Sequence, residues 1–120
     1  MNKKIEEALN NQINYEMFSG YLYLSMSSWF EQRNLKGFSH WLRVQFQEEM
    51  SHERGGKVVL NEIQAPKADW ADPIDVFKNV VLHEERITQL INDIVHMGYE
   101  EKDYGSVNFL QILVEEQVEE

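Results

Sequence analysis

Residues that interrupt helices are rare in this chain, and their scarcity constrains its fold more than any other feature. Among 120 residues only two are prolines, Pro66 and Pro73, and no low-complexity tract occurs. Because proline and glycine are the usual helix breakers, we predict long helices on both sides of residues 57–71, which lack a helical period. That segment reads as an extended crossover, in which residues 58–60 most resemble a strand.

The first half of the chain predicts a helical hairpin. Apolar residues recur at helical spacing over residues 3–32, which we expect to form one long helix. Asn34 is expected to cap a second helix that runs from about residue 35 to residue 54. Gly55-Gly56 then ends that helix.

The second half predicts another hairpin. Asp72 followed by Pro73 is a strong helix start, and Gly98 suits the C′ position of the same helix. Asp103 is expected to cap a fourth helix that reaches Glu120. Two hairpins and one long crossover between helices two and three predict an all-α, antiparallel four-helix bundle, a single domain over residues 1–120. The alternative is a pair of hairpins that associates only between chains.

Composition excludes several classes of protein. Acidic residues outnumber basic ones 21 to 11, and the net charge is −10. This argues against nucleic-acid binding and favours cations as partners, although a solvated acidic surface is the more common cause. Cysteine is absent, which excludes disulfide scaffolds and thiolate metal sites. No apolar run approaches the ~18 residues of a membrane span, and the N-terminal residues are too polar for a secretory signal. We therefore expect a cytoplasmic protein.

Acidic residues interrupt the apolar stripes of all four predicted helices. Glu16 and Glu49 lie at equal sequence distances from the first predicted turn, and Glu84 and Glu116 lie at equal distances from the second. In each antiparallel hairpin the two acids should therefore share one level, roughly 16 residues or ~24 Å from the turn. Buried carboxylates cost several kcal/mol each, against a domain stability of ~5–15 kcal/mol. Either they are protonated, or they face water, or they bind cations.

The donor set indicates which cations would fit. Glu49 and His52, three residues apart, project side by side. Carboxylates with one imidazole and no sulfur suit Fe(II), Mn(II) or Zn(II), and glutamates with Glu-x-x-His form di-metal sites in helical bundles. Taken alone, Glu-x-x-His is a weak signal, and residues 115–120 could be a solvated acidic tail. Tyr23 is expected to be a core tyrosine.

The residues together resemble the prokaryotic non-haem ferritins, and the resemblance covers nearly the whole chain. It runs through the segments NQINYEMFSGYLYLSMSSWF, FSHWLRVQFQEEMSH, VLHEERITQLINDIV and NFLQILVEEQVEE. As a set it is carried by Glu16 with Tyr23, Glu49-x-x-His52, Glu84, and Glu116-Gln117 followed by Glu119-Glu120.

The resemblance implies a ferritin-like fold and an iron-storing ferroxidase, which oxidises Fe(II) to Fe(III) with dioxygen at a di-iron centre. By position, Glu16, Glu49 and His52 would bind the first iron, and Glu49 would bridge to a second iron that Glu84 also holds. Gln117 would lie near the dioxygen side and Tyr23 beside the centre. A third iron site would use Glu48, Glu116, Glu119 and Glu120. The expected partners are ferrous iron, dioxygen or peroxide, and copies of the chain in a homo-oligomeric cage (of twenty-four subunits in the family) that stores ferric mineral.

The chain departs from the family's pattern in length. After His52 the family usually has about nine more residues, and its fourth helix continues past the position of Glu120. Either a stretch is silently joined at His52-Glu53, which we favour, or the chain is a shortened variant. A bundle shortened in this way would expose Ile5, Leu9 and Ile13.

Two other functions remain open. A rubrerythrin-like di-iron peroxidase resembles the same bundle but usually adds a Cys-rich module, which this chain lacks. A non-catalytic acidic helical interaction module would need no metal. A bacterioferritin would want a second Glu-x-x-His on the fourth helix and a haem methionine, so no haem is expected.

Overall fold

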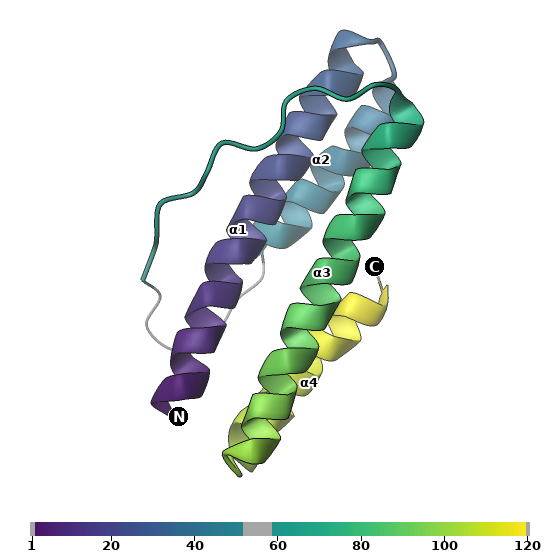
Figure 1. Ribbon diagram of the computed structural model, residues 1–120. Helices are drawn as coiled ribbons and strands as arrows, with labels where there is room; N and C mark the ends of the chain where they lie inside the picture. Colours follow the sequence, from purple (N-terminus) through teal and green to yellow (C-terminus); the bar gives the residue numbers. More distant parts are fainter. Residues whose placement is uncertain (1, 52–58, 120) are drawn as a thin grey trace. The chain divides into compact units, whose positions relative to one another are not determined.

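The computed structural model describes residues 2–51 and 59–119, although not the side chains of Ser51 and Glu119. Every regular element in this part of the chain is an α-helix: α1 (Lys3–Gln32), α2 (Lys36–Ser51), α3 (Pro73–Glu100) and α4 (Tyr104–Glu119) (Figure 1). The predicted all-α class is confirmed. No helix among the described residues combines the length and the apolar character that crossing a membrane requires.

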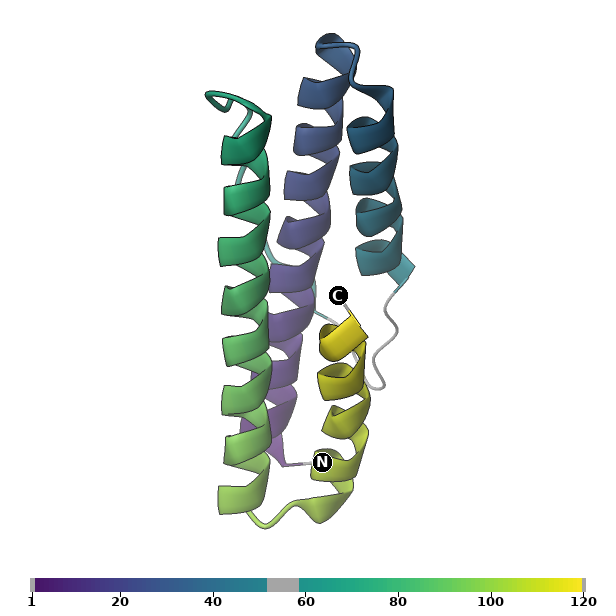
Figure 2. The ribbon, with the colours of Figure 1, turned by 90° about the vertical axis from the view of Figure 1, so that its right-hand side faces the viewer.

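The chain divides into two compact units, one of residues 13–80 and the other of residues 1–12 with residues 81–120. In the first unit, α1 and α2 are joined by a tight turn (Figure 2). Asn34 adopts φ 58°, and the N–H groups of Asn34 and Leu35 donate to the carbonyls of Glu31 and Phe30 at 3.1 and 3.0 Å. This Schellman arrangement makes Asn34 the C′ residue of α1. Its predicted role as the cap of α2 is wrong.

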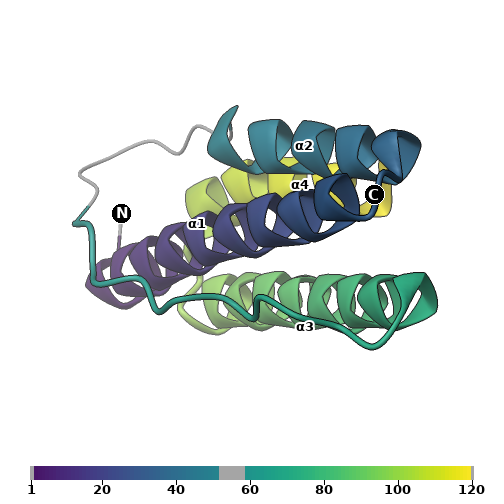
Figure 3. The same ribbon diagram turned by 90° about the horizontal axis from the view of Figure 1, so that it is seen from above.

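The crossover runs beside α1 in the same direction (Figure 3). The side chain of Asn14 bonds both the carbonyl of Val59 (2.9 Å) and the N–H of Asn61 (2.8 Å). Further along, Ser25 donates to the carbonyl of Lys67 at 2.7 Å. The predicted strand character fails for residues 59 and 60, which belong to no strand, because helix side chains satisfy this backbone in place of a partner strand. Residue 58 lies outside the described part.

The third helix begins where its sequence predicts. The Asp72 carboxylate accepts from the N–H of Asp75 at 2.8 Å, and the Asp75 carboxylate accepts from the N–H of Ala71 at 3.0 Å. This reciprocal capping satisfies backbone donors that a helix start would otherwise leave unpaired. Pro73, as the first helical residue, has no N–H to leave unsatisfied.

Aromatic side chains pack together where α1, α2 and the start of α3 meet in the first unit. Phe30 is fully buried, and its ring centroid lies 5.2 Å from that of Phe38 and 5.7 Å from that of Phe77. Trp29 packs edge-on against Trp70 at 6.1 Å. Phe38, predicted to face inward, is 45% exposed, because it covers the rim of this cluster.

In the second unit, α3 and α4 are joined by the same kind of turn. Lys102 adopts φ 55°, and the N–H groups of Lys102 and Asp103 donate to the carbonyls of Tyr99 and Gly98 at 3.1 and 3.0 Å. Lys102, not Gly98, is therefore the C′ residue of α3, and that prediction is wrong. Asp103 caps α4 as expected, accepting from the N–H of Ser106 at 3.2 Å.

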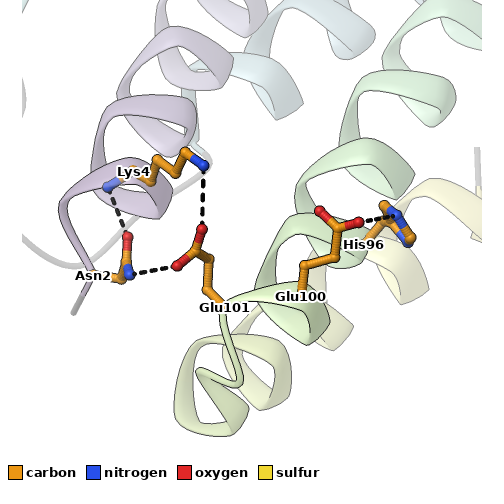
Figure 4. A network of polar contacts seen from close by, with 5 residues as sticks. All are labelled: Asn2, Lys4, His96, Glu100 and Glu101. Atoms are coloured by element: carbon orange, nitrogen blue, oxygen red, sulfur yellow. Dashed lines mark hydrogen bonds and ion pairs between the residues drawn. The ribbon is translucent and has the colours of Figure 1, made fainter.

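The start of α1 is tied to this turn by polar contacts (Figure 4). Lys4 pairs with Glu101 at 3.2 Å, and Asn2 bonds both Glu101 and Asp103 at 3.3 Å. Ile5 and Leu9 are buried, at 0% and 5% exposure. The expectation that a short second helix would leave them exposed is therefore wrong.

Candidate functional site

The buried face of α1 is polar at its centre. Ile5 and Leu9 form one end of this face, and Met26 and Phe30 form the other. Between them lie four buried residues that carry polar atoms, at helical spacing: Gln12, Glu16, Ser19 and Tyr23. A carboxylate such as that of Glu16, only 5% exposed, is costly without compensation. The sequence predicted the burial of Glu16 and Tyr23 but missed Gln12, although extending the stripe back from Glu16 would have found it.

Glu49 supplies a second buried carboxylate, from α2. It is 6% exposed, whereas the neighbouring Glu48 is exposed. A Cβ placed on Gly20 of α1 would lie 3.4 Å from the Cβ of Glu49 and would overlap the end of Met50. The absence of a side chain at Gly20 therefore allows α2 to approach α1 closely at the level of Glu49.

In the α3–α4 hairpin, Gln117 holds Glu84. The amide Nε2 of Gln117 donates to the Glu84 carboxylate at 2.8 Å and to the Glu84 carbonyl at 3.2 Å. Both side chains are partly exposed. The sequence analysis paired Glu84 with Glu116, which is also partly buried, but the amide one position further along α4 makes the contact.

His83, beside Glu84 in the chain, is buried with 7% exposure. Burial lowers the pKa of His83, and the nearby negative charge of Glu84 opposes that shift. The imidazole is therefore neutral at neutral pH. The sequence gave no basis for choosing between a surface and a core position for this residue.

The two hairpins share one layout when positions are counted from their turns. Glu16 precedes Asn34 by 18 residues (16 to 34), and Glu84 precedes Lys102 by 18 (84 to 102). On the returning helices, Glu49 follows Asn34 by 15 residues and Gln117 follows Lys102 by 15. Both turns have the same left-handed C′ geometry. Each hairpin therefore presents a glutamate opposite a second oxygen-bearing side chain, at the same distance from its turn.

The described residues include no group of three or more His, Cys, Asp or Glu side chains arranged to hold a metal ion. Two predicted ligands, His52 and Glu120, lie outside the described residues, and the side chain of Glu119 does too. The predicted ligand set thus stays a prediction. Within each hairpin, the described donors are carboxylates and one amide, which are hard ligands suited to ferrous and ferric iron.

Comparisons with known proteins agree with one another. The family model of the ferritin-like domain matches residues 6–120. The bacterial non-heme ferritin of Bacteroides fragilis (strain 638R) is 39% identical over 129 residues, which cover the whole chain and 81% of that protein. That of Escherichia coli O6:H1 is 36% identical over 95% of the chain and 74% of its own length.

Solved structures give the same answer. The open-pore ferritin of Archaeoglobus fulgidus superposes with a TM-score of 0.94 at 47% identity, over 99% of this chain and 78% of its own. Chlorobium tepidum ferritin gives 0.93 at 35% identity, over 99% and 78%. The predicted four-helix bundle is confirmed. With its sequence matched end to end and its helices superposed on solved ferritins, the chain belongs to the ferritin family of iron-storage proteins.

Proposed function

We propose that this chain is a ferroxidase, which oxidises Fe(II) with dioxygen before the iron is stored as ferric mineral. Two ferrous ions each give one electron to dioxygen, which takes up two protons and leaves as hydrogen peroxide. Iron is the substrate, and the ferric product passes on to storage. The observation that carries the proposal is the burial of Glu16 and Glu49, two carboxylates at one level of the α1–α2 hairpin.

The roles of the residues follow the family resemblance. We assign Glu16, Glu49 and His52 to the first iron, Glu49 and Glu84 to the second, and Tyr23 and Gln117 to the surroundings of the reaction. A third iron would be held by Glu48, Glu116, Glu119 and Glu120. Carboxylate oxygens stabilise Fe(III) over Fe(II), because they are hard anionic ligands. Their preference drives oxidation.

Electrostatics supports a cation at this level of the fold. Buried charges are stable when they are paired or coordinate metal, and the chain carries a net charge of −10. Divalent cations would offset the carboxylates and concentrate near them. The neutral amide of Gln117, in the position that Glu49 takes in the other hairpin, lowers the anionic charge beside Glu84. We therefore expect the iron held by Glu84 to bind more weakly, which favours turnover over permanent retention.

We propose a homo-oligomeric cage in the cytoplasm, as the family resemblance implies. The alignment with the Bacteroides fragilis relative spans nine more positions than the 120 residues of the chain, the number expected after His52. If the difference lies there, inserting the relative's nine residues after His52 should increase the assembled fraction in gel filtration. An equal fraction with and without the insertion would argue against that location.

Aerobic Fe(II) titration tests the enzyme directly. Wild type should show a fast rise in ferric absorbance, and Glu49→Ala and His52→Ala should lose it. Glu85→Ala is the matched control, because Glu85 is exposed and neighbours Glu84. Its rate should equal that of wild type. Equal rates in all four proteins would leave only the non-catalytic module, and faster oxidation by hydrogen peroxide than by dioxygen would indicate a peroxidase.

A further inference from the structure

Gln12 is the one member of the polar band on α1 whose amide is left over. Its side chain is 2% exposed, and its Nε2 atom is buried with no hydrogen-bond acceptor among the described residues. Ser19, on the same face, donates its hydroxyl to the carbonyl of Tyr15 at 3.0 Å. Most buried polar side-chain atoms are hydrogen-bonded, so an exception calls for a specific explanation.

The position of Gln12 suggests what its amide is for. It precedes Glu16 by four residues on an unbroken helix, and side chains four residues apart lie on the same face, about 5–6 Å between their Cβ atoms. A primary amide nitrogen has two donors and no acceptor capacity. It would repel a cation but would bind an oxygen that accompanies one.

We propose that Gln12 is a positioning residue for the cation at Glu16: its Nε2 donates a hydrogen bond to a water or hydroxide that enters with the ion. This inference rests on the proposed function, which places iron at Glu16. Hydrated divalent cations keep some water when carboxylates replace the rest. In a site that excludes bulk solvent, a fixed donor orients the retained oxygen, and the oxygen gives the buried amide the acceptor it lacks.

The proposal predicts opposite effects on the metal-free and the metal-bound protein. Gln12→Leu removes the unpaired donor at similar volume, so the Tm of the metal-free protein should rise. The same change removes a hydrogen bond from the bound state, so Co(II) affinity, measured by titration calorimetry, should fall about threefold to tenfold. Co(II) is the probe because it does not react with dioxygen here, so binding is read without turnover.

Two controls make the result specific. Asn11→Leu changes the exposed neighbour of Gln12 and should leave Co(II) affinity unchanged. Gln12→Met, an unbranched replacement, should behave as Gln12→Leu does and serves if the leucine variant misfolds. Glu16→Gln should abolish the Co(II) binding that Gln12 modulates.

The failures are distinguishable. Co(II) affinity that is unchanged in both Gln12 variants, while Glu16→Gln still abolishes binding, would overturn the role of Gln12 and leave the ferroxidase proposal standing. Wild type that binds no Co(II) at Glu16 would overturn both. A lower Tm for the metal-free Gln12 variants would show that the amide stabilises the metal-free fold, which also contradicts the proposal.

Discussion

The Gln117–Glu84 contact allows a sharp test, because changing one atom converts an attraction into a repulsion. Gln117→Glu replaces the Nε2 donor, now 2.8 Å from the Glu84 carboxylate and 3.2 Å from its carbonyl, with an oxygen. Two unit charges 4 Å apart repel by about 1 kcal/mol in water and about 4 kcal/mol near a protein surface. Because both side chains are partly exposed, we expect the metal-free protein to lose about 1–3 kcal/mol, including the lost hydrogen bonds. This corresponds to a drop in Tm of roughly 4–12 °C.

Gln117→Met is the matched control, since it also loses both hydrogen bonds but adds no charge. At pH 7 the glutamate variant should unfold at a lower temperature than the methionine variant. Each carboxylate raises the pKa of the other in the folded state, so the repulsive penalty exists above that pKa and fades as pH falls below about 4.3, the ordinary pKa of glutamate. Added Co(II) should stabilise the glutamate variant more than wild type. Equal Tm values for the two variants at pH 7 would refute the reasoning.

Three further predictions concern the turns and helix ends. Gly98→Ala would place a Cβ 2.8 Å from Cγ2 of the buried, β-branched Val107, and we expect a loss of about 1–2 kcal/mol in thermal or denaturant unfolding; a gain would contradict the packing. Gly37→Ala meets nothing within 4 Å and should gain up to about 1 kcal/mol of helix propensity in the same assay; any loss would be unexpected. Hydrogen bonds from Ser106 hold the pKa of Asp103 below its usual value, so Asp103→Ala should lower the Tm at pH 7. That difference should shrink as pH falls below 3.8 through the folded-state pKa, and a difference that is constant with pH would exclude the charge as its cause.

The long helices were predictable because each has a local cause. Residues 3–32 contain no proline and only one glycine, and they carry a continuous apolar stripe, so α1 has the predicted bounds. The Asp72-Pro73 start depends on backbone groups within four residues of each other. The turns were less predictable, because Asn34 and Lys102 take left-handed φ values that local sequence only weakly favours. Gly98 was misplaced because packing against Val107, a tertiary contact, explains it better than chain reversal does.

The site was predictable in level but not in partner. Counting residues from the turns placed Glu84 opposite the right part of α4, but one residue of error amounts to 1.5 Å of rise and 100° of rotation. That is the difference between Glu116 and Gln117, and only packed coordinates distinguish them. Gln12 escaped notice because an amide can sit on a buried stripe without a charge to mark it.

The shared layout of the hairpins turns a difference in one side chain into an argument about mechanism. Counted from equivalent turns, Glu16 corresponds to Glu84, and Glu49 corresponds to Gln117. The first pair carries two carboxylates, both buried. The second carries one carboxylate, which an amide already neutralises in part by a hydrogen bond. A cation approaching Glu84 must compete with that bond, whereas one approaching the buried pair relieves an electrostatic cost. If both pairs take iron, occupancy should therefore be sequential, with the α1–α2 hairpin filled first.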